Sequence, residues 1–185
     1  MSTRTVVHLG VLVAISIILT RMFSVMVPIA GVMGIRLSFG EIPLMLAGIM
    51  FGPLAGAAAG VVADLTGVGI FGGPYFPGFT LSFALVGFIP GLLLYKKVRD
   101  LTFWQLVIAV LVTDIIVSLI LNTLWLSIMF DKAVTVLLPP RLLARAILIP
   151  AYSMLLWIIV RRYRVLEAST TPNREASHAG SGDTG

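Results

Sequence analysis

Two basic clusters, KKVR (96–99) and RRYR (161–164), enclose a part of the chain that is almost entirely apolar. This part contains two runs, 102–129 and 138–160, and each is long enough to form a helix that spans a bilayer. The chain as a whole is 58% hydrophobic and only 11% charged, which is typical of an integral membrane protein and not of a soluble domain. In such a chain, basic clusters at the ends of apolar runs are topology anchors and do not indicate nucleic-acid binding.

The apolar pattern predicts an all-α integral membrane protein with six transmembrane helices. The segment 42–63 could be one span by length, but Gly52-Pro53 lies in its middle, where proline removes a backbone donor. We therefore expect two short helices that turn there. A glycine-rich connector, 29–40, follows the first helix. The predicted helices are 5–27, 40–51, 53–67, 79–95, 102–129 and 138–160.

The positive-inside rule places both basic clusters on the cytoplasmic side of the membrane. Counting back over six helices puts both termini in the cytoplasm, whereas one long helix over 42–63 would put the N-terminus outside. Residues 1–167 are expected to form a single transmembrane domain. Residues 168–185 lack apolar periodicity and are rich in Ser, Thr and Gly, so we expect a disordered cytoplasmic tail.

Ionised side chains inside or beside these apolar runs are the candidate binding residues. Each costs about 2.5–3.5 kcal/mol at the bilayer centre, so it is kept where it pairs or binds something. In the predicted topology, Arg36 and Glu41 lie in the first outer connector. Asp64 ends the helix 53–67, just before a glycine-rich aromatic loop.

Arg141 and Arg145 lie one helical turn apart on one face of the last helix. Pro139-Pro140 is expected to place them in its first turns. Two like charges at this spacing repel, and a helix N-terminus disfavours cations, so a shared anionic ligand would offset both costs. The alternatives are snorkelling to the interface, or pairing with Asp131 or Glu41.

A second polar row lies on the helix 102–129. Asp114, Ser118 and Asn122 follow an i, i+4, i+8 pattern, with Trp125 close to the same face, and this row is expected to face the bundle interior. Asn122 and Trp125 fall toward the outer end and are candidate ligand contacts. Asp114 lies deeper, where pairing with an arginine is the alternative.

The loop before the fourth helix combines aromatic residues with an acid. A carboxylate such as Asp64 can accept two hydrogen bonds from a heterocycle that bears an amino group beside a ring N–H. Aromatic rings would then cover the faces of that heterocycle, although an interfacial aromatic belt is the alternative. The candidate residues of this loop are Tyr75, Phe76, Pro77, Gly78, Phe79 and Thr80.

The residues needed for catalysis are missing from the sequence. There is no P-loop motif for ATP, no cysteine, and the two histidines, His8 and His178, stand at opposite ends of the chain. We therefore expect neither an enzyme, nor a metal centre, nor a bound cofactor. Binding or transport remains.

Five motifs together resemble the substrate-binding S components of energy-coupling factor (ECF) vitamin transporters, and specifically their folate family (FolT). The PGFTLS element points to folate and not to riboflavin or thiamine. The motifs read RLSFGEIPLMLAG from Arg36, GPLAGAAAGVVAD from Gly52, YFPGFTLS from Tyr75, NTLWL from Asn122 and PPRLLAR from Pro139.

The resemblance implies a multi-pass protein of a prokaryotic plasma membrane. It implies six helices and an outward-facing vitamin pocket closed by the first and third loops. It also implies that a separate T component and two ATP-binding-cassette ATPase subunits deliver the substrate. The family's small-xxx-small docking motif for the T component matches Gly10 and Ala14.

Folate would match the candidate residues. Asp64 or Glu41 would suit its pterin edge, and Phe76, Phe79 and Trp125 would suit its rings. Arg141 and Arg145 would suit its glutamate carboxylates. The alternatives are an S component for another vitamin, or a self-sufficient secondary transporter that would need Asp114 as a titratable relay.

Overall fold

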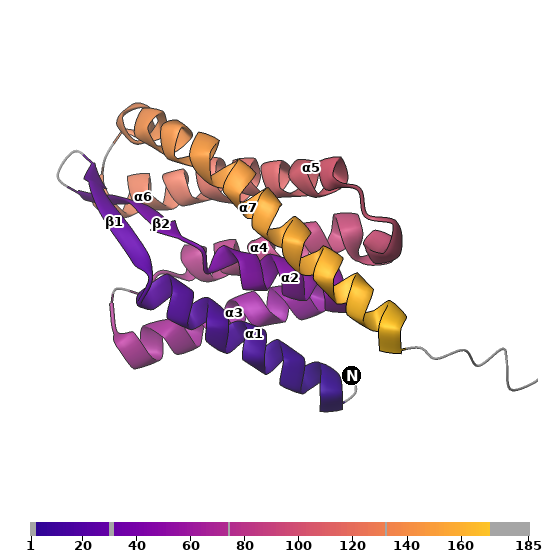
Figure 1. The fold of residues 1–185 in the computed structure, drawn as a ribbon. Helices are drawn as coiled ribbons and strands as arrows, with labels where there is room; N and C mark the ends of the chain where they lie inside the picture. Colours follow the sequence, from indigo (N-terminus) through magenta and orange to yellow (C-terminus); the bar gives the residue numbers. More distant parts are fainter. Residues whose placement is uncertain (1–2, 30–31, 74, 132, 171–185) are drawn as a thin grey trace, which may run out of the picture.

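The computed structural model describes residues 3–29, 32–73, 75–131 and 133–170. Helices run side by side along most of the chain, and a short hairpin caps one end of the bundle (Figure 1). The elements in chain order are α1 (Thr3–Arg21), β1 (Ser24–Ile29), β2 (Val32–Ser38), α2 (Glu41–Phe51), α3 (Pro53–Phe71), α4 (Pro77–Leu94), η1 (Tyr95–Asp100), α5 (Phe103–Thr113), η2 (Asp114–Leu121), α6 (Asn122–Phe130) and α7 (Val134–Thr170).

The Gly52-Pro53 step separates two helices, as predicted. Gly52 adopts φ 101°, which a residue with a side chain rarely reaches, and Pro53 opens α3 at the position where its missing N–H costs nothing. α3 then continues to Phe71, four residues beyond the predicted end at 67. The loop between α3 and α4 is therefore shorter than the sequence indicated.

The first helix is shorter than predicted. α1 ends at Arg21 and not at residue 27, because the chain enters an antiparallel hairpin at Ser24. In this hairpin Met26 pairs with Arg36, and the register shifts between Val27 and Pro28. Proline cannot donate to the ladder, which is consistent with an irregularity there. The all-α prediction is therefore wrong for this connector, whose β-branched residues alternate enough to pair.

Glycines allow α2, α3 and α4 to pack with their backbones in contact. A Cβ atom added at Gly48 or Gly56 would collide with the carbonyl group of Gly87, and one at Gly60 would collide with that of Phe83. Gly56 and Gly60 are one helical turn apart, so they leave one face of α3 bare, and this face is used for close helix packing. This packing places the N-terminal end of α4 against α3, beside Asp64.

The predicted helix 102–129 is continuous but contains a π-helical segment. Residues of η2 follow α5 without a break, and α6 follows in turn. Each turn of a π helix contains more residues than an α-helical turn, so η2 shifts the angular position of every side chain after it. The simple i, i+4, i+8 row predicted from the sequence is altered there.

Five helical stretches in the described part of the chain are long and apolar enough to cross a membrane, and α2 is a shorter apolar helix. The chain is therefore a multi-pass membrane protein. The N-terminus of α1, the α4–α5 junction and the C-terminal end of α7 lie at one end of the bundle (Figure 1). α7 continues to Thr170, into the predicted tail, and residues 171–185 lie outside the described residues, so the tail remains a prediction.

Candidate functional site

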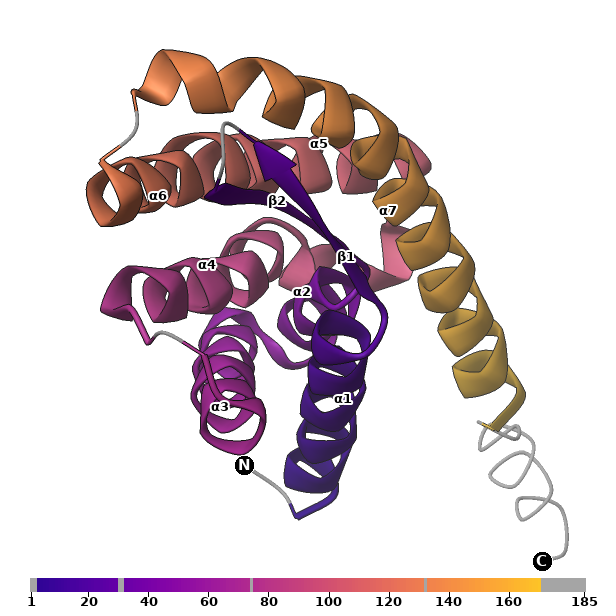
Figure 2. The same cartoon turned by 90° about the vertical axis from the view of Figure 1, so that its left-hand side faces the viewer.

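The hairpin end of the bundle holds a charged cluster, which we define as Glu41, Asp114, Arg141 and Arg145. Figure 2 looks onto this end, where β1 and β2 cross from α1 toward α6 and α7 passes along the outside. Glu41 opens α2 directly after the hairpin, Asp114 opens η2, and both arginines come from α7. The fold therefore joins groups from three helical segments that are far apart in sequence.

Arg145 pairs with both acids of the charged cluster. Its Nη1 donates to Asp114 Oδ1 at 2.7 Å and to Glu41 Oε2 at 3.3 Å, while its Nη2 donates to Glu41 Oε1 at 3.3 Å. The side chain of Asp114 is fully buried, and that of Glu41 is 19% exposed. Two of the alternatives predicted from the sequence are therefore confirmed: Arg145 pairs with Glu41, and Asp114 has an arginine partner.

Arg141 has a different environment from Arg145. Its Nη1 donates to the carbonyl oxygen of Ser118 at 2.9 Å and to Thr123 Oγ1 at 3.1 Å. Ser118 lies in the π-helical η2, so Arg141 connects α7 to this segment through a backbone carbonyl group. Arg141 is thus held over the η2–α6 junction by hydrogen bonds, one helical turn from the ion pairs of Arg145.

The prediction that these arginines occupy the first turns of their helix is wrong. α7 begins at Val134, so Pro139 and Arg141 already lie within it. The apolar sequence VTVLL extends the helix on the N-terminal side of the prolines. Repulsion by the positive end of the helix dipole therefore does not act on these arginines, whereas repulsion between the two adjacent like charges does.

Asp64 lies within α3 and not at its end, because this helix runs on to Phe71. It is buried, and its Oδ2 accepts a hydrogen bond from Thr80 Oγ1 at 2.7 Å. The structure thus brings together two predicted site residues, one from α3 and one from the first turn of α4. Helix packing through the glycines makes this contact possible.

An aromatic cluster, which we define as Phe76, Phe79 and Trp125, lies at the start of α4. The ring of Phe76 is 5.8 Å from that of Phe79 and 5.7 Å from that of Trp125, between centroids. Trp125 Nε1 also donates to Ser82 Oγ at 3.3 Å. Gly78 is required here, since a Cβ atom would stand 2.6 Å from Trp125 Cδ2. Four predicted residues, Phe76, Gly78, Phe79 and Trp125, therefore lie in contact with one another.

Other predicted residues have different positions. Tyr75 is half exposed and Pro77 opens α4. Asn122 opens α6, and its Oδ1 is buried without a hydrogen-bond partner in the described part of the chain. Gly10 and Ala14 lie on an exposed face of α1. The backbone of Arg36 lies in β2, but its side chain lies outside the described residues.

Tyr152 is a buried residue near the site that none of the sequence motifs indicated. Its hydroxyl donates to the carbonyl oxygen of Ser38, at the end of β2, and its ring meets that of Phe39 edge-on at 6.0 Å. It thereby connects α7 to the segment between the hairpin and Glu41. A lone tyrosine in the apolar run of the last helix was the available signal.

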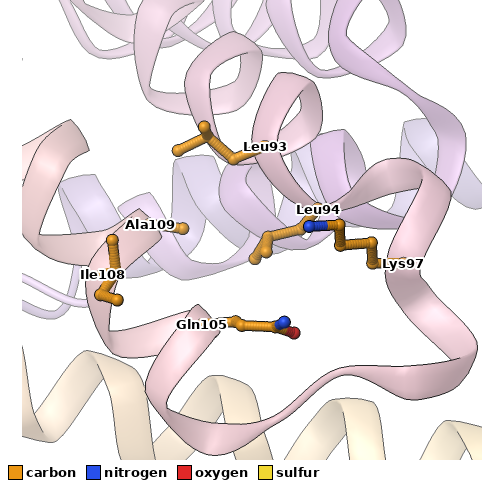
Figure 3. A pocket seen from close by; sticks show the side chains of 6 residues that line it. All are labelled: Leu93, Leu94, Lys97, Gln105, Ile108 and Ala109. Carbon is orange, nitrogen blue, oxygen red and sulfur yellow. The ribbon is translucent and has the colours of Figure 1, made fainter.

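A small crease at the other end of the bundle is unrelated to these clusters. It has a volume of about 150 Å³ and a mainly apolar lining (Figure 3). None of the predicted site residues lines it. It lies between the end of α4, η1 and α5, with Leu93, Leu94, Lys97, Gln105, Ile108 and Ala109 around it. Within the described ranges, no group of three or more His, Cys, Asp or Glu residues could hold a metal ion.

Comparisons with known proteins agree with this architecture. A family model described as the ECF-type riboflavin transporter, S component, matches residues 1–161. A folate transporter FolT of Clostridium novyi (strain NT) is 35% identical over 164 residues, which cover 86% of this chain and 91% of that protein. A FolT of Leuconostoc mesenteroides subsp. mesenteroides is 28% identical over 134 residues, which cover 72% and 69%.

A solved structure has the same fold. The crystal structure of FolT bound with folic acid matches with a TM-score of 0.77 and 30% sequence identity, over 87% of this chain and 95% of that one. The match extends over nearly all the described helices. The chain therefore belongs to the S components of ECF-type transporters and, within them, to the relatives of the folate transporter FolT.

Proposed function

We propose that this protein is the folate-binding S subunit of an ECF-type vitamin importer. The observation that carries the proposal is the match, over nearly the whole fold, to a FolT bound with folic acid. A charged cluster and an aromatic cluster at one end of the bundle are consistent with it. Folate combines a planar pterin with a dianionic glutamate, and these two parts need those two kinds of surroundings.

The proposed binding residues divide along the two parts of the ligand. Asp64 is the better candidate for the pterin edge, because both carboxylate oxygens of Glu41 accept hydrogen bonds from Arg145. The aromatic cluster would cover the ring faces, with Thr80, Tyr75, Pro77 and Gly78 around it.

Arg141 and Arg145 would bind the carboxylates, and the unpartnered oxygen of Asn122 would accept a ligand N–H. Arg36 completes the proposed set.

We further propose six membrane spans, with α2 as the short one, and both termini in the cytoplasm of the cell. The basic segments 96–99 and 161–164 support this orientation, because they lie at the same end of the bundle as the N-terminus of α1 (Figure 1). By the positive-inside rule that end is cytoplasmic. The charged and aromatic clusters then face outward, where a nutrient arrives.

We also propose that a T component and two ATPase subunits complete the importer. Gly10 and Ala14 are exposed on α1, and a Cβ atom at Gly10 would meet nothing within 4 Å. A bare helix face of this kind lets another membrane helix approach closely. Energy for transport would then come from the partners, and this chain would supply recognition.

A binding screen tests the proposed substrate. The detergent-purified chain should bind folate at one molecule per chain without ATP, and unlabelled folate should displace it while riboflavin and thiamine should not. Riboflavin is the competitor that matters most, because the matching family model is described as a riboflavin transporter component. Displacement by riboflavin at equal concentration would assign the site to that vitamin instead.

A further inference from the structure

We propose that Glu41 occupies the place of a ligand carboxylate on Arg145 when no ligand is bound. When the ligand binds, its carboxylate would displace Glu41 from Arg145. This inference rests on the proposed function, since it assigns a glutamate carboxylate of folate to Arg145. The exchange would determine which ligands the site accepts. It depends on a difference between the two acids that bond Arg145.

The bond from Arg145 to Asp114 is the tighter of the two pairings. At 2.7 Å it has the length of a good charge-assisted hydrogen bond, and the Asp114 side chain is fully buried. Glu41 instead accepts two bonds of 3.3 Å, and 19% of its side chain is exposed. Arg145 Nη1 donates to both acids, one N–H to each.

The cost of separating the two pairs differs for the same reason. Removing Asp114 from Arg145 would leave a buried carboxylate without its cation, which is strongly unfavourable. Glu41 is already partly open to solvent and can regain hydration when it leaves. The structure therefore marks Asp114 as the permanent counter-ion and Glu41 as the replaceable one.

Charge balance favours an exchange in which Glu41 moves toward solvent. The two arginines of the charged cluster are matched by its two acids, so the cluster carries no net charge. A dianionic ligand added to it would leave two excess negative charges in a poorly hydrated site. If a ligand carboxylate takes the place of Glu41 on Arg145, the surroundings of Arg145 keep the same charge.

Release of Glu41 would change the contacts at the junction between the hairpin and α2. The carbonyl oxygen of Gly40, the residue before Glu41, accepts a 2.7 Å hydrogen bond from Ser16 of α1. The carbonyl oxygen of Ser38 accepts one from Tyr152 of α7. Displacement of Glu41 by the ligand carboxylate would therefore affect the hydrogen bonds that hold this junction in place. A neutral ligand would leave Glu41 on Arg145 and would not affect them.

The variant Glu41→Gln tests the exchange. It removes the competing charge and keeps the size of the side chain, so folate should bind more tightly relative to hydroxymethylpterin, which has no carboxylate. We expect the ratio of the two affinities to rise about tenfold, equivalent to about 1.4 kcal/mol. Asp114→Asn is the matched comparison, and it should raise that ratio less or not at all, because Glu41 then remains as the carboxylate on Arg145 and is harder to displace.

An unchanged or lower ratio in a folded Glu41→Gln protein would overturn the exchange. If that variant does not fold, the wild-type chain with folate bound answers the same question by structure determination. Separation of Glu41 from Arg145 beyond 4 Å, with a folate carboxylate on Arg145, supports the proposal, and a retained pair refutes it. Failure of the wild type to bind any folate would instead remove the proposed function and this inference together.

Discussion

Arg145 donates a 2.7 Å hydrogen bond to the fully buried carboxylate of Asp114 and thereby fastens α7 to η2. The two residues are 31 positions apart in sequence. Within a membrane, a buried charge of this kind persists only with its partner in place. The pair therefore stabilises the fold first of all, and the proposed ligand site lies next to it.

Replacing Asp114 with Asn should destabilise the protein by about 3 kcal/mol, because it leaves a buried arginine with only the looser partner Glu41. The loss should appear as a lower midpoint of thermal unfolding in detergent. Asp131→Asn is the control. Asp131 is exposed at φ 50°, a conformation that asparagine also tolerates, so this change should leave the midpoint within error.

Replacing Arg141 with Ala should weaken folate binding by roughly 10- to 100-fold, the equivalent of a charged hydrogen bond of about 1.5–3 kcal/mol. Binding of hydroxymethylpterin should change much less, since that ligand has no carboxylate. Isothermal titration of both ligands measures the difference. Arg162→Ala, an exposed arginine at the other end of α7, is the matched control. Equal losses for both ligands would contradict a carboxylate role for Arg141.

Replacing Gly78 with Ala should weaken binding of folate and of hydroxymethylpterin alike, by at least about tenfold. The new Cβ atom would lie 2.5 Å from Phe76 Cε1 and 2.6 Å from Trp125 Cδ2, so the aromatic cluster must shift. Tryptophan fluorescence should report the shift directly. Gly10→Ala is the control, because nothing lies within 4 Å of its Cβ position, and it should leave both affinities unchanged.

Replacing Gly87 with Ala should destabilise the bundle by roughly 3 kcal/mol, because the added methyl group collides with the backbone of Gly56 across the α3–α4 contact. Gly69→Ala provides the comparison. It lies in α3 with open space around it, so it should be neutral or stabilising by up to about 1 kcal/mol. Thermal unfolding of both variants would show whether close backbone packing, and not helix propensity, sets the stability.

Replacing Gly10 with Leu should leave folate affinity intact and abolish most uptake in proteoliposomes that contain the partner subunits and ATP. A bulky side chain would prevent another helix from approaching the exposed face of α1. Gly69→Leu makes the same change at another exposed helical position and should preserve uptake. Loss of folate binding in Gly10→Leu would show that α1 serves the binding site and not a partner.

Much of the fold was readable from local chemistry. The break between α2 and α3 follows from Gly52 and Pro53, since proline lacks a backbone donor and glycine tolerates φ 101°. The apolar runs predicted the membrane helices because each run matches the thickness of the bilayer. Motifs such as PGFTLS pointed to the family because their order is specific.

Only the folded structure shows which charged residues pair with one another. Arg145 finds Glu41, 104 positions away, through the packing of α7 against α2, and no local pattern encodes such a distance. The hairpin after α1 and the π-helical η2 were equally hidden, because pairing across strands and the slip of a helical turn depend on neighbouring elements. Helix periodicity fixes which residues share a face, but only tertiary packing fixes which faces meet.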